Sequence, residues 1–134
     1  MCIIFSIFCQ GALLYGGEYH FSSRSKTIFG KSLYDQDAPC AVCRSPMSSA
    51  LMIPGRNRCY DDWHLEYSGY LVGGSSTHPA TSEFICLDED PEMIPGGEGN
   101  DNGKLFFLAE VRCGSLKCPP YVNGSELTCV VCAK

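Results

Sequence analysis

The clearest hydrophobic pattern in the chain lies at residues 63–71, where apolar and polar side chains alternate. The apolar positions are Trp63, Leu65 and Tyr67, and the polar ones are His64, Glu66 and Ser68. A period of two is typical of a β-strand with one buried face. The pattern therefore predicts a strand here, with Trp63, the only tryptophan of the chain, in the core.

Two further runs, 83–87 and 104–113, are rich in β-branched and aromatic residues. Between the runs lie segments dense in Gly, Pro, Asn and Ser, at 73–76, 95–97 and 99–103, which predict turns and loops. No stretch shows a sustained helical period. We therefore expect an all-β fold: a small disulfide-rich domain with short antiparallel strands and long Gly/Pro-rich loops.

A Cys-x-x-Cys unit occurs twice, at Cys40/Cys43 and at Cys129/Cys132, each time around small or β-branched residues that favour an extended strand. Side chains three apart on a strand point to opposite faces. The two cysteines of a unit therefore cannot easily bond each other, and each is available to a different distant cysteine.

Two other interpretations of these units fit less well. A redox Cys-x-x-Cys needs a helix N-terminus to stabilise its thiolate, and Val130-Val131 is a poor start for a helix. A zinc site usually places its two Cys-x-x-Cys pairs roughly 15–20 residues apart, far closer than these two units. Disulfides are therefore the preferred interpretation, and we expect neither a metal nor a cofactor.

Composition points to the same conclusion. Ten cysteines in 134 residues are rare in the reducing cytosol, so the chain is expected to be secreted. Asn123-Gly124-Ser125 is an N-glycosylation sequon. A net charge of −5 without a basic cluster argues against nucleic-acid binding. No apolar run is long enough to span a bilayer.

Residues 1–13 form an apolar start with three open interpretations. Met1 to Cys9 resembles the apolar part of a signal peptide, but no basic residue precedes it as it normally would. The alternatives are a short buried strand or the ragged start of a truncated chain.

No catalytic set stands out, and we expect no enzymatic activity. Asp88, Glu89, Asp90 and Glu92 form an acidic run without the ligand spacing of a known calcium loop, so a solvated loop is the default. His20, His64 and His78 are scattered, and Ser115 has no accompanying base. Three tyrosines are candidates either for a sugar-binding surface or for a small core: Tyr67, Tyr70 and Tyr121.

Several motifs together resemble the C-terminal non-collagenous region of the short-chain (spongin-type) collagens of sponges and other invertebrates. The resemblance covers residues 14–134. Its motifs are Pro39–Cys43, Met52–Arg56, Trp63–Leu71, Cys113–Tyr121 and Glu126–Cys132. The cysteine order is also distantly similar to one subdomain of the non-collagenous C-terminal domain of type IV collagen. The chain departs from a collagen in having no Gly-X-Y run, and residues 1–10 do not fit the pattern.

The resemblance implies three disulfides, Cys59–Cys132, Cys86–Cys129 and Cys113–Cys118. It also implies that residues 44–134 are a complete half-domain, and that residues 14–43 are the remnant of a first half whose earlier cysteines are missing. Cys2, Cys9, Cys40 and Cys43 then have no family partners, and we expect free thiols, irregular pairing or crosslinks between chains.

The function implied is that of a secreted, non-enzymatic extracellular-matrix module. Its partners would be other collagen-like chains or matrix components, with the full-length protein assembling as a homotrimer. The alternative is a lectin-like extracellular module that recognises a carbohydrate or another ligand.

Overall fold

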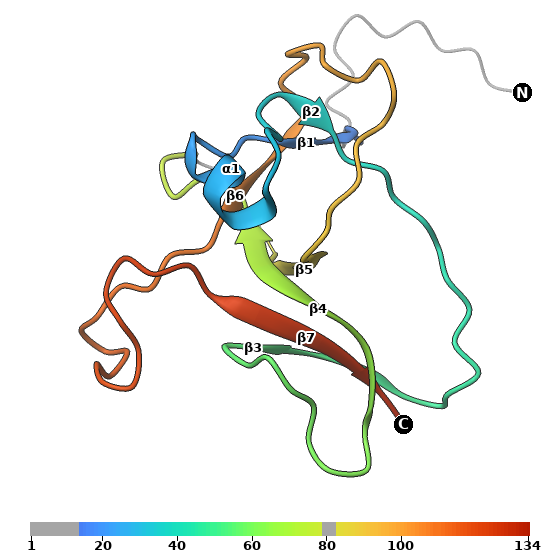
Figure 1. The fold of residues 1–134 in the computed structure, drawn as a ribbon, viewed down its shortest axis with the longest axis vertical. Helices are drawn as coiled ribbons and strands as arrows, with labels where there is room; N and C mark the ends of the chain where they lie inside the picture. Colours follow the sequence, from blue (N-terminus) through green and yellow to red (C-terminus); the bar gives the residue numbers. More distant parts are fainter. Residues whose placement is uncertain (1–13, 79–82) are drawn as a thin grey trace, which may run out of the picture.

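The central element of the fold is β4, a ten-residue strand that pairs with β5, β6 and β7. The computed structural model describes residues 14–78 and 83–134 (Figure 1). In chain order the elements are β1 (Gly17–Tyr19), α1 (Arg24–Phe29), β2 (Gln36–Asp37), β3 (Ala50–Pro54), β4 (His64–Gly73), β5 (Ile85–Asp88), β6 (Lys104–Leu108) and β7 (Thr128–Ala133).

The strands form one mixed sheet in the order β2-β1-β6-β4-β7-β3, with β5 paired to β4 outside this path. The predicted all-β, disulfide-rich fold is confirmed. One detail of it is wrong: β1 pairs with β6 in parallel, although the other pairings are antiparallel. The two partners lie some 85 residues apart along the chain, so no local turn signal could reveal this pairing.

The predicted strand runs at 63–71, 83–87 and 104–113 correspond to β4, β5 and β6, with shifted ends. The sequence did not predict the six-residue helix α1, because so short a helix spans less than two turns and shows no clear helical period. It ends at Gly30, whose φ of 69° lies in the left-handed region that glycine adopts without strain. None of the helices among the described residues is long and apolar enough to cross a membrane.

The prediction that Trp63 lies in the core is wrong. Trp63 precedes β4 and is only half-buried, and its strand neighbour Leu65 is 45 % exposed. Burial in β4 changes along the strand instead of alternating: its first residues are exposed and Leu71 and Val72 are buried. The reason is that β5, β6 and the helix cover only the second half of β4, so both faces of the first half stay accessible.

Two apolar clusters lie on opposite faces of that second half, because adjacent strand residues point in opposite directions. Val72 packs with Tyr19, Phe21 and Leu33 from the N-terminal part of the chain. Leu71 packs with Cys86 and Cys129. The helix joins the first cluster through Phe29, whose ring meets the edge of Tyr70 at 5.4 Å between centroids.

The predicted boundary at residue 43 does not divide the core in the structure. Residues 17–38 supply β1, β2 and α1, and their side chains pack against Val72, Phe106 and Leu108 from beyond the boundary. The idea that this part descends from a first half-domain stays a prediction.

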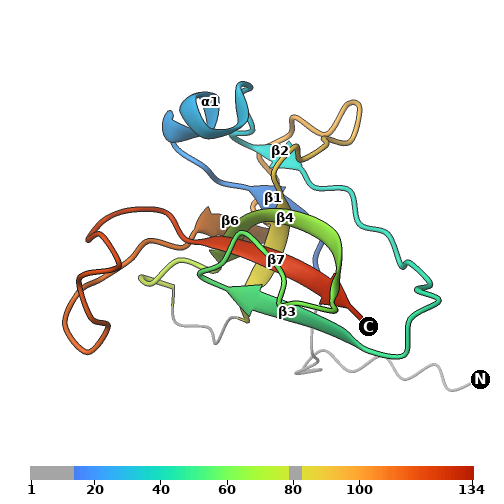
Figure 2. The ribbon, with the colours of Figure 1, turned by 60° about the horizontal axis from the view of Figure 1, so that its bottom comes forward.

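The segment between β2 and β3 runs outside the sheet, on the right of Figures 1 and 2. Residues 39–49 are all exposed and none of residues 38–49 belongs to a strand. The expectation that Cys40 and Cys43 share the strand context of Cys129 and Cys132 is therefore wrong. A run of small and β-branched residues forms a strand only where a neighbouring strand pairs with it, and this run has none.

Candidate functional site

The cysteines of β7 lead to two separate bridges. Cys129 is bonded to Cys86, and Cys132 is bonded to Cys59. Together with Cys113–Cys118 these are the three pairs that the family resemblance implies. Cys129 and Cys132 are both fully buried and point to opposite faces of β7, as their spacing of three requires.

The Cys86–Cys129 bridge crosses over β4, since β5 and β7 pair with β4 on either side. In a flat sheet such flanking strands are about 9.6 Å apart. Here the two Cα atoms are only 5.7 Å apart. Gly69 permits this approach: a Cβ atom at Gly69 would meet the carbonyl oxygen of Leu87 in β5 at an impossible 1.7 Å. The missing side chain thus lets β5 fold over β4.

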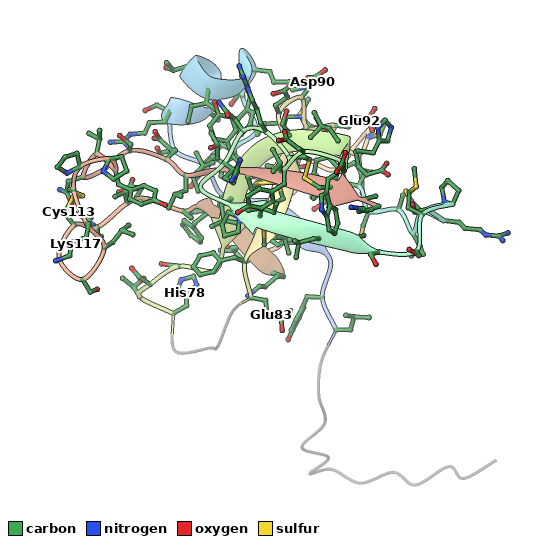
Figure 3. All side chains as sticks on the ribbon, turned by 90° about the horizontal axis from the view of Figure 1, so that it is seen from below. His78, Glu83, Asp90, Glu92, Cys113 and Lys117 are labelled. Carbon is green, nitrogen blue, oxygen red and sulfur yellow. A yellow bond between two sulfur atoms is a disulfide. The ribbon has the colours of Figure 1, made fainter. Side chains whose placement is uncertain are left out.

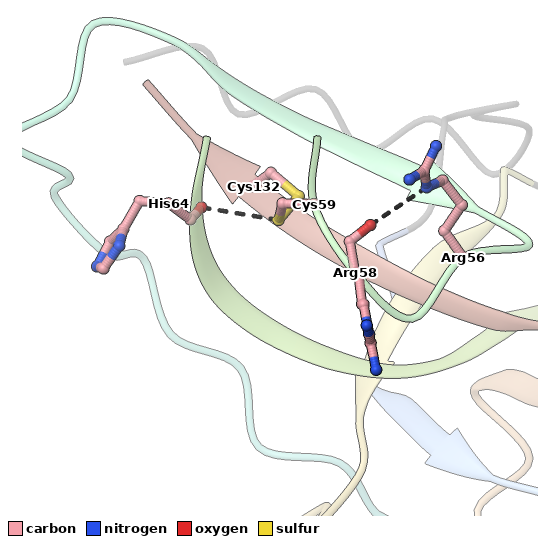
Figure 4. The surroundings of a disulfide bond; sticks show 5 residues. All are labelled: Arg56, Arg58, Cys59, His64 and Cys132. Atoms are coloured by element: carbon pink, nitrogen blue, oxygen red, sulfur yellow. Dashed lines mark hydrogen bonds between the residues drawn. A yellow bond between two sulfur atoms is a disulfide. The ribbon is translucent and has the colours of Figure 1, made fainter. Parts of the chain in front are cut away.

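The other two bridges close surface structures. Cys59 holds the loop before β4 to β7, and its Sγ lies 3.8 Å from the carbonyl oxygen of His64 (Figure 4). Cys113–Cys118 closes a short turn between residues five apart in the sequence. The backbone N–H of Cys113 donates to Oδ1 of the exposed Asn123 at 3.1 Å, so the sequon asparagine is held against this turn. Glycosylation at Asn123 stays a prediction.

Two cysteines of the described part have no partner. Cys40 and Cys43 are free and exposed in the segment between β2 and β3. Cys2, Cys9 and the whole predicted leader of residues 1–13 lie outside the described residues.

The acidic run does not converge on one point. Asp88 accepts the backbone N–H of Asp90, Glu89 accepts from Ser68, and Asp90 pairs with Lys31 at 2.7 Å. Figure 3 shows Asp90 and Glu92 on the side of α1 and β2, away from the loop with Cys113 and Lys117. These separate partners give the run no calcium-binding arrangement.

The other sequence candidates are dispersed. His64 and His78 are exposed, and Ser115 lies in the exposed Cys113–Cys118 turn. The tyrosines do not gather on one surface. Tyr67 donates to the carbonyl oxygen of Cys86, Tyr70 packs against the helix, and Tyr121 lies against Gly55.

His20 is the exception, because it belongs to a cluster that sequence reasoning missed. Atoms of Glu18, His20 and Asp35 lie within 4.8 Å of one another. Glu18 lies in β1 and His20 directly follows the strand, so the two are two residues apart, and the backbone N–H of Asp35 donates to the carbonyl oxygen of Tyr19 between them. A Glu-x-His pair on a strand was the available signal, but residues 17–19 are too few to show a strand period.

An apolar groove of about 1250 Å³ lies beside β5 and β1. Its walls are mostly aromatic and aliphatic, with carboxylates along them and Cys40 at the rim. They include Tyr15, Tyr19, Cys40, Tyr67, Ile85, Asp88, Asp90, Pro91, Glu92, Ile94 and Phe106. Two hydroxyls of the wall are engaged with the chain itself, since Tyr19 donates to the carbonyl oxygen of Glu92 and Tyr67 to that of Cys86.

Comparison with known proteins identifies no relative. No family model matches the chain, and neither a curated protein nor a solved structure is significantly similar to it. The functional argument therefore depends on the chain's own cysteines, groove and polar cluster.

Proposed function

We propose that the chain is a secreted, non-enzymatic extracellular-matrix module that joins other collagen-like chains through Cys40 and Cys43. The observation that carries the proposal is the contrast between its cysteines. Six of them form three bridges within the chain, whereas Cys40 and Cys43 are exposed on a segment outside the sheet. Exposed thiols in an oxidising compartment are expected to form disulfides, and here a second chain can supply the partners.

The proposed module acts as a rigid base for assembly. Two of its bridges fasten β7 to β5 and to the loop before β4, so the C-terminal sheet is covalently fixed. The reactive segment between β2 and β3 lies outside that sheet, where a second chain can reach it (Figure 1). A homotrimer is the assembly that the resemblance to short-chain collagens implies.

The test is covalent assembly of the full chain. Each inter-chain disulfide forms from two thiols with loss of two protons and two electrons, which oxidised glutathione accepts as it is reduced to two thiols. We expect oxidised glutathione to convert the purified monomer into covalent oligomers on non-reducing gels. The Cys40→Ser/Cys43→Ser variant should stay monomeric, whereas the matched Cys2→Ser/Cys9→Ser variant should still crosslink.

Two outcomes contradict the proposal. One is a wild-type chain that stays monomeric and carries a Cys40–Cys43 link on peptide mapping. The other is crosslinking that persists in the Cys40→Ser/Cys43→Ser variant.

The alternative function, a lectin-like recognition module, is favoured by the groove. Apolar ring faces beside carboxylates are the arrangement with which proteins bind sugars and other small polar ligands. A glycan array distinguishes the two functions. The recognition module requires saturable binding to defined glycans that is lost in Ile94→Asp, a variant at an exposed position of the groove. The assembly module requires none.

A further inference from the structure

We infer that Glu18, His20 and Asp35 form a binding site for one Zn²⁺ ion. The site has a ligand set of one imidazole nitrogen and two carboxylate oxygens, contributed by β1, by the residue that follows it and by the turn before β2. Nothing in the proposed assembly function requires it. The inference depends on three observations: an unpartnered buried carboxylate, the geometry of the three donor atoms, and the contacts that fix their side chains.

The first observation is the burial of Glu18. Its side chain is only 2 % exposed, and its Oε1 has no hydrogen-bond partner. A buried carboxylate oxygen without a partner is strongly unfavourable, so proteins pair such groups or use them to bind metals. The same cluster contains two other buried atoms without hydrogen-bond partners, His20 Nδ1 and Asp35 Oδ1, which form an ion pair when the imidazole is protonated. With a neutral imidazole whose Nδ1 carries no proton, the cluster offers three lone-pair-bearing atoms, which are complementary to a cation.

The second observation is the spacing of the donors. His20 Nδ1 and Asp35 Oδ1 are 3.3 Å apart. Zinc bonds of about 2.0–2.1 Å in a tetrahedron place two ligand atoms about 3.3–3.4 Å apart. All three atoms already lie within 4.8 Å of one another, so a small rotation of the side chains completes the site. Three protein ligands leave the fourth position to water, which can enter because His20 and Asp35 are 26 % and 19 % exposed.

The third observation is that outer contacts orient each ligand, as they do in known metal sites. The other oxygen of Glu18, Oε2, accepts the backbone N–H groups of Asp101 and Asn102 at 3.1 and 3.2 Å. The His20 ring packs against the rings of Tyr34 and Phe107, at 4.8 and 5.2 Å between centroids. The backbone N–H of Asp35 is bonded to Tyr19.

The ligand types select the metal. Ca²⁺ and Mg²⁺ take oxygen ligands, whereas an imidazole nitrogen together with carboxylates suits Zn²⁺. The two carboxylates also balance the charge of a divalent ion in a mostly buried position. Bound zinc would tie β1 to the turn before β2, and through Glu18 to the loop at 101–102.

The test is zinc titration of the full chain with its disulfides intact. Free thiols are first alkylated with iodoacetamide, because Cys40 and Cys43 are themselves zinc ligands when deprotonated. After dialysis against a chelator, calorimetry with ZnCl2 should give one saturable site per chain, and CaCl2 and MgCl2 should give none. Zinc should also raise the melting temperature.

Two conservative variants locate the site. Asp35→Asn and Glu18→Gln should each weaken zinc binding at least tenfold and abolish the thermal shift. The matched control His64→Asn removes an exposed histidine outside the cluster and should bind within twofold of wild type. Asp35 has a φ of 54°, a conformation that asparagine tolerates, so Asp35→Asn decides the question if Glu18→Gln does not fold.

The inference is overturned if the alkylated wild type shows no saturable zinc binding, which would mean that water satisfies these atoms. It is equally overturned if Asp35→Asn binds zinc as wild type does while retaining the wild-type near-ultraviolet dichroism.

Discussion

Neighbouring residues of β1 have opposite environments, and Tyr19 gives this contrast a measurable consequence. Glu18 belongs to the polar cluster, whereas Tyr19 points to the other face, is 2 % exposed and donates its hydroxyl to the carbonyl oxygen of Glu92 at 3.0 Å. Burial, with the negative charges of Glu92 and Asp88, raises the pKa of Tyr19 from 10 to about 12. Burial and then Asp88 also raise the pKa of Tyr67.

We therefore predict that Tyr19 and Tyr67 both titrate late in the folded chain, with the phase near pH 12 belonging to Tyr19. Because the folded-state pKa of Tyr19 lies above its unfolded value, its contribution to stability is complete below pH 10 and is lost as the pH rises towards 12. Absorbance at 295 nm against pH should show the late phase near pH 12 in the wild type, and Tyr19→Phe should lack it. The exposed Tyr34 provides the control, because Tyr34→Phe should leave the late phase in place. An unchanged late phase in Tyr19→Phe contradicts the prediction.

At the scale of residues, the sequence predicts the local chemistry of a side chain better than the position of that side chain in the fold. The spacing of Cys129 and Cys132 was enough to indicate separate partners, because strand geometry fixes their directions within a few ångströms. The cluster of Glu18, His20 and Asp35 requires a turn to bring residue 35 back to β1, and the buried state of Glu18 requires the loop at 101–102. Burial by residues that are distant in the sequence leaves no pattern in the sequence around the buried residue.

At the scale of elements, strands rich in β-branched and aromatic residues were predictable, whereas β1, β2 and β3 were not. β4, β5 and β6 contain enough β-branched and aromatic residues for a strand to be predicted from the sequence, and turn residues mark their ends. β1 and β2 have three and two residues, and they exist because β6 offers β1 a paired edge. The alternation in β4 predicted a strand correctly and burial incorrectly, since burial depends on which half of the strand its neighbours cover.

The crossing of β5 over β4 predicts a severe effect of a single methyl group. In Gly69→Ala the Cβ atom would overlap the carbonyl oxygen of Leu87, so β5 must move away from β4 and Cys86 away from Cys129. We expect a loss of roughly 3 kcal/mol or more in the free energy of unfolding, measured with urea. The matched control is Gly16→Ala, where a Cβ meets nothing within 4 Å, and its change should be within about 0.5 kcal/mol. Equal stability of the two variants would show that β5 does not cross at Gly69.

At the scale of the whole molecule, the disulfides and the non-covalent contacts join different parts of the chain. All three bridges lie between Cys59 and Cys132. Residues 17–38 are held to the remainder by the pairing of β1 with β6 and by their shared apolar cluster. The exposed segment at 39–49 is the covalent link between the two parts.

We predict that trypsin cuts this link first, after Arg44, which is exposed and belongs to no element. Proteases cut an extended, accessible backbone, and the backbone of paired strands is not accessible to them. The two pieces should elute together on native size exclusion and separate on a non-reducing denaturing gel, because none of the bridges among residues 14–78 and 83–134 crosses residue 44. Arg44→Gln should remove this first cut. Early cleavage elsewhere, or pieces that part under native conditions, would contradict the prediction.

The bridge between Cys59 and Cys132 also decides how the molecule carries mechanical load. A tension applied at residue 14 and at Lys134 travels along the backbone to Cys59, through the sulfur atoms to Cys132, and out at the C-terminus. The pairings of β1 with β6 and of β3 with β7 carry part of this load until they break, after which the covalent path bypasses residues 60–131. With 45 residues between residue 14 and Cys59, a single-molecule pulling experiment should release about 150 Å of contour length, and about 400 Å once the disulfides are reduced. The chain can thus yield under load over residues 14–59, with β1 and β3 detaching from the sheet, while the Cys59–Cys132 bridge keeps residues 60–131 from being extended.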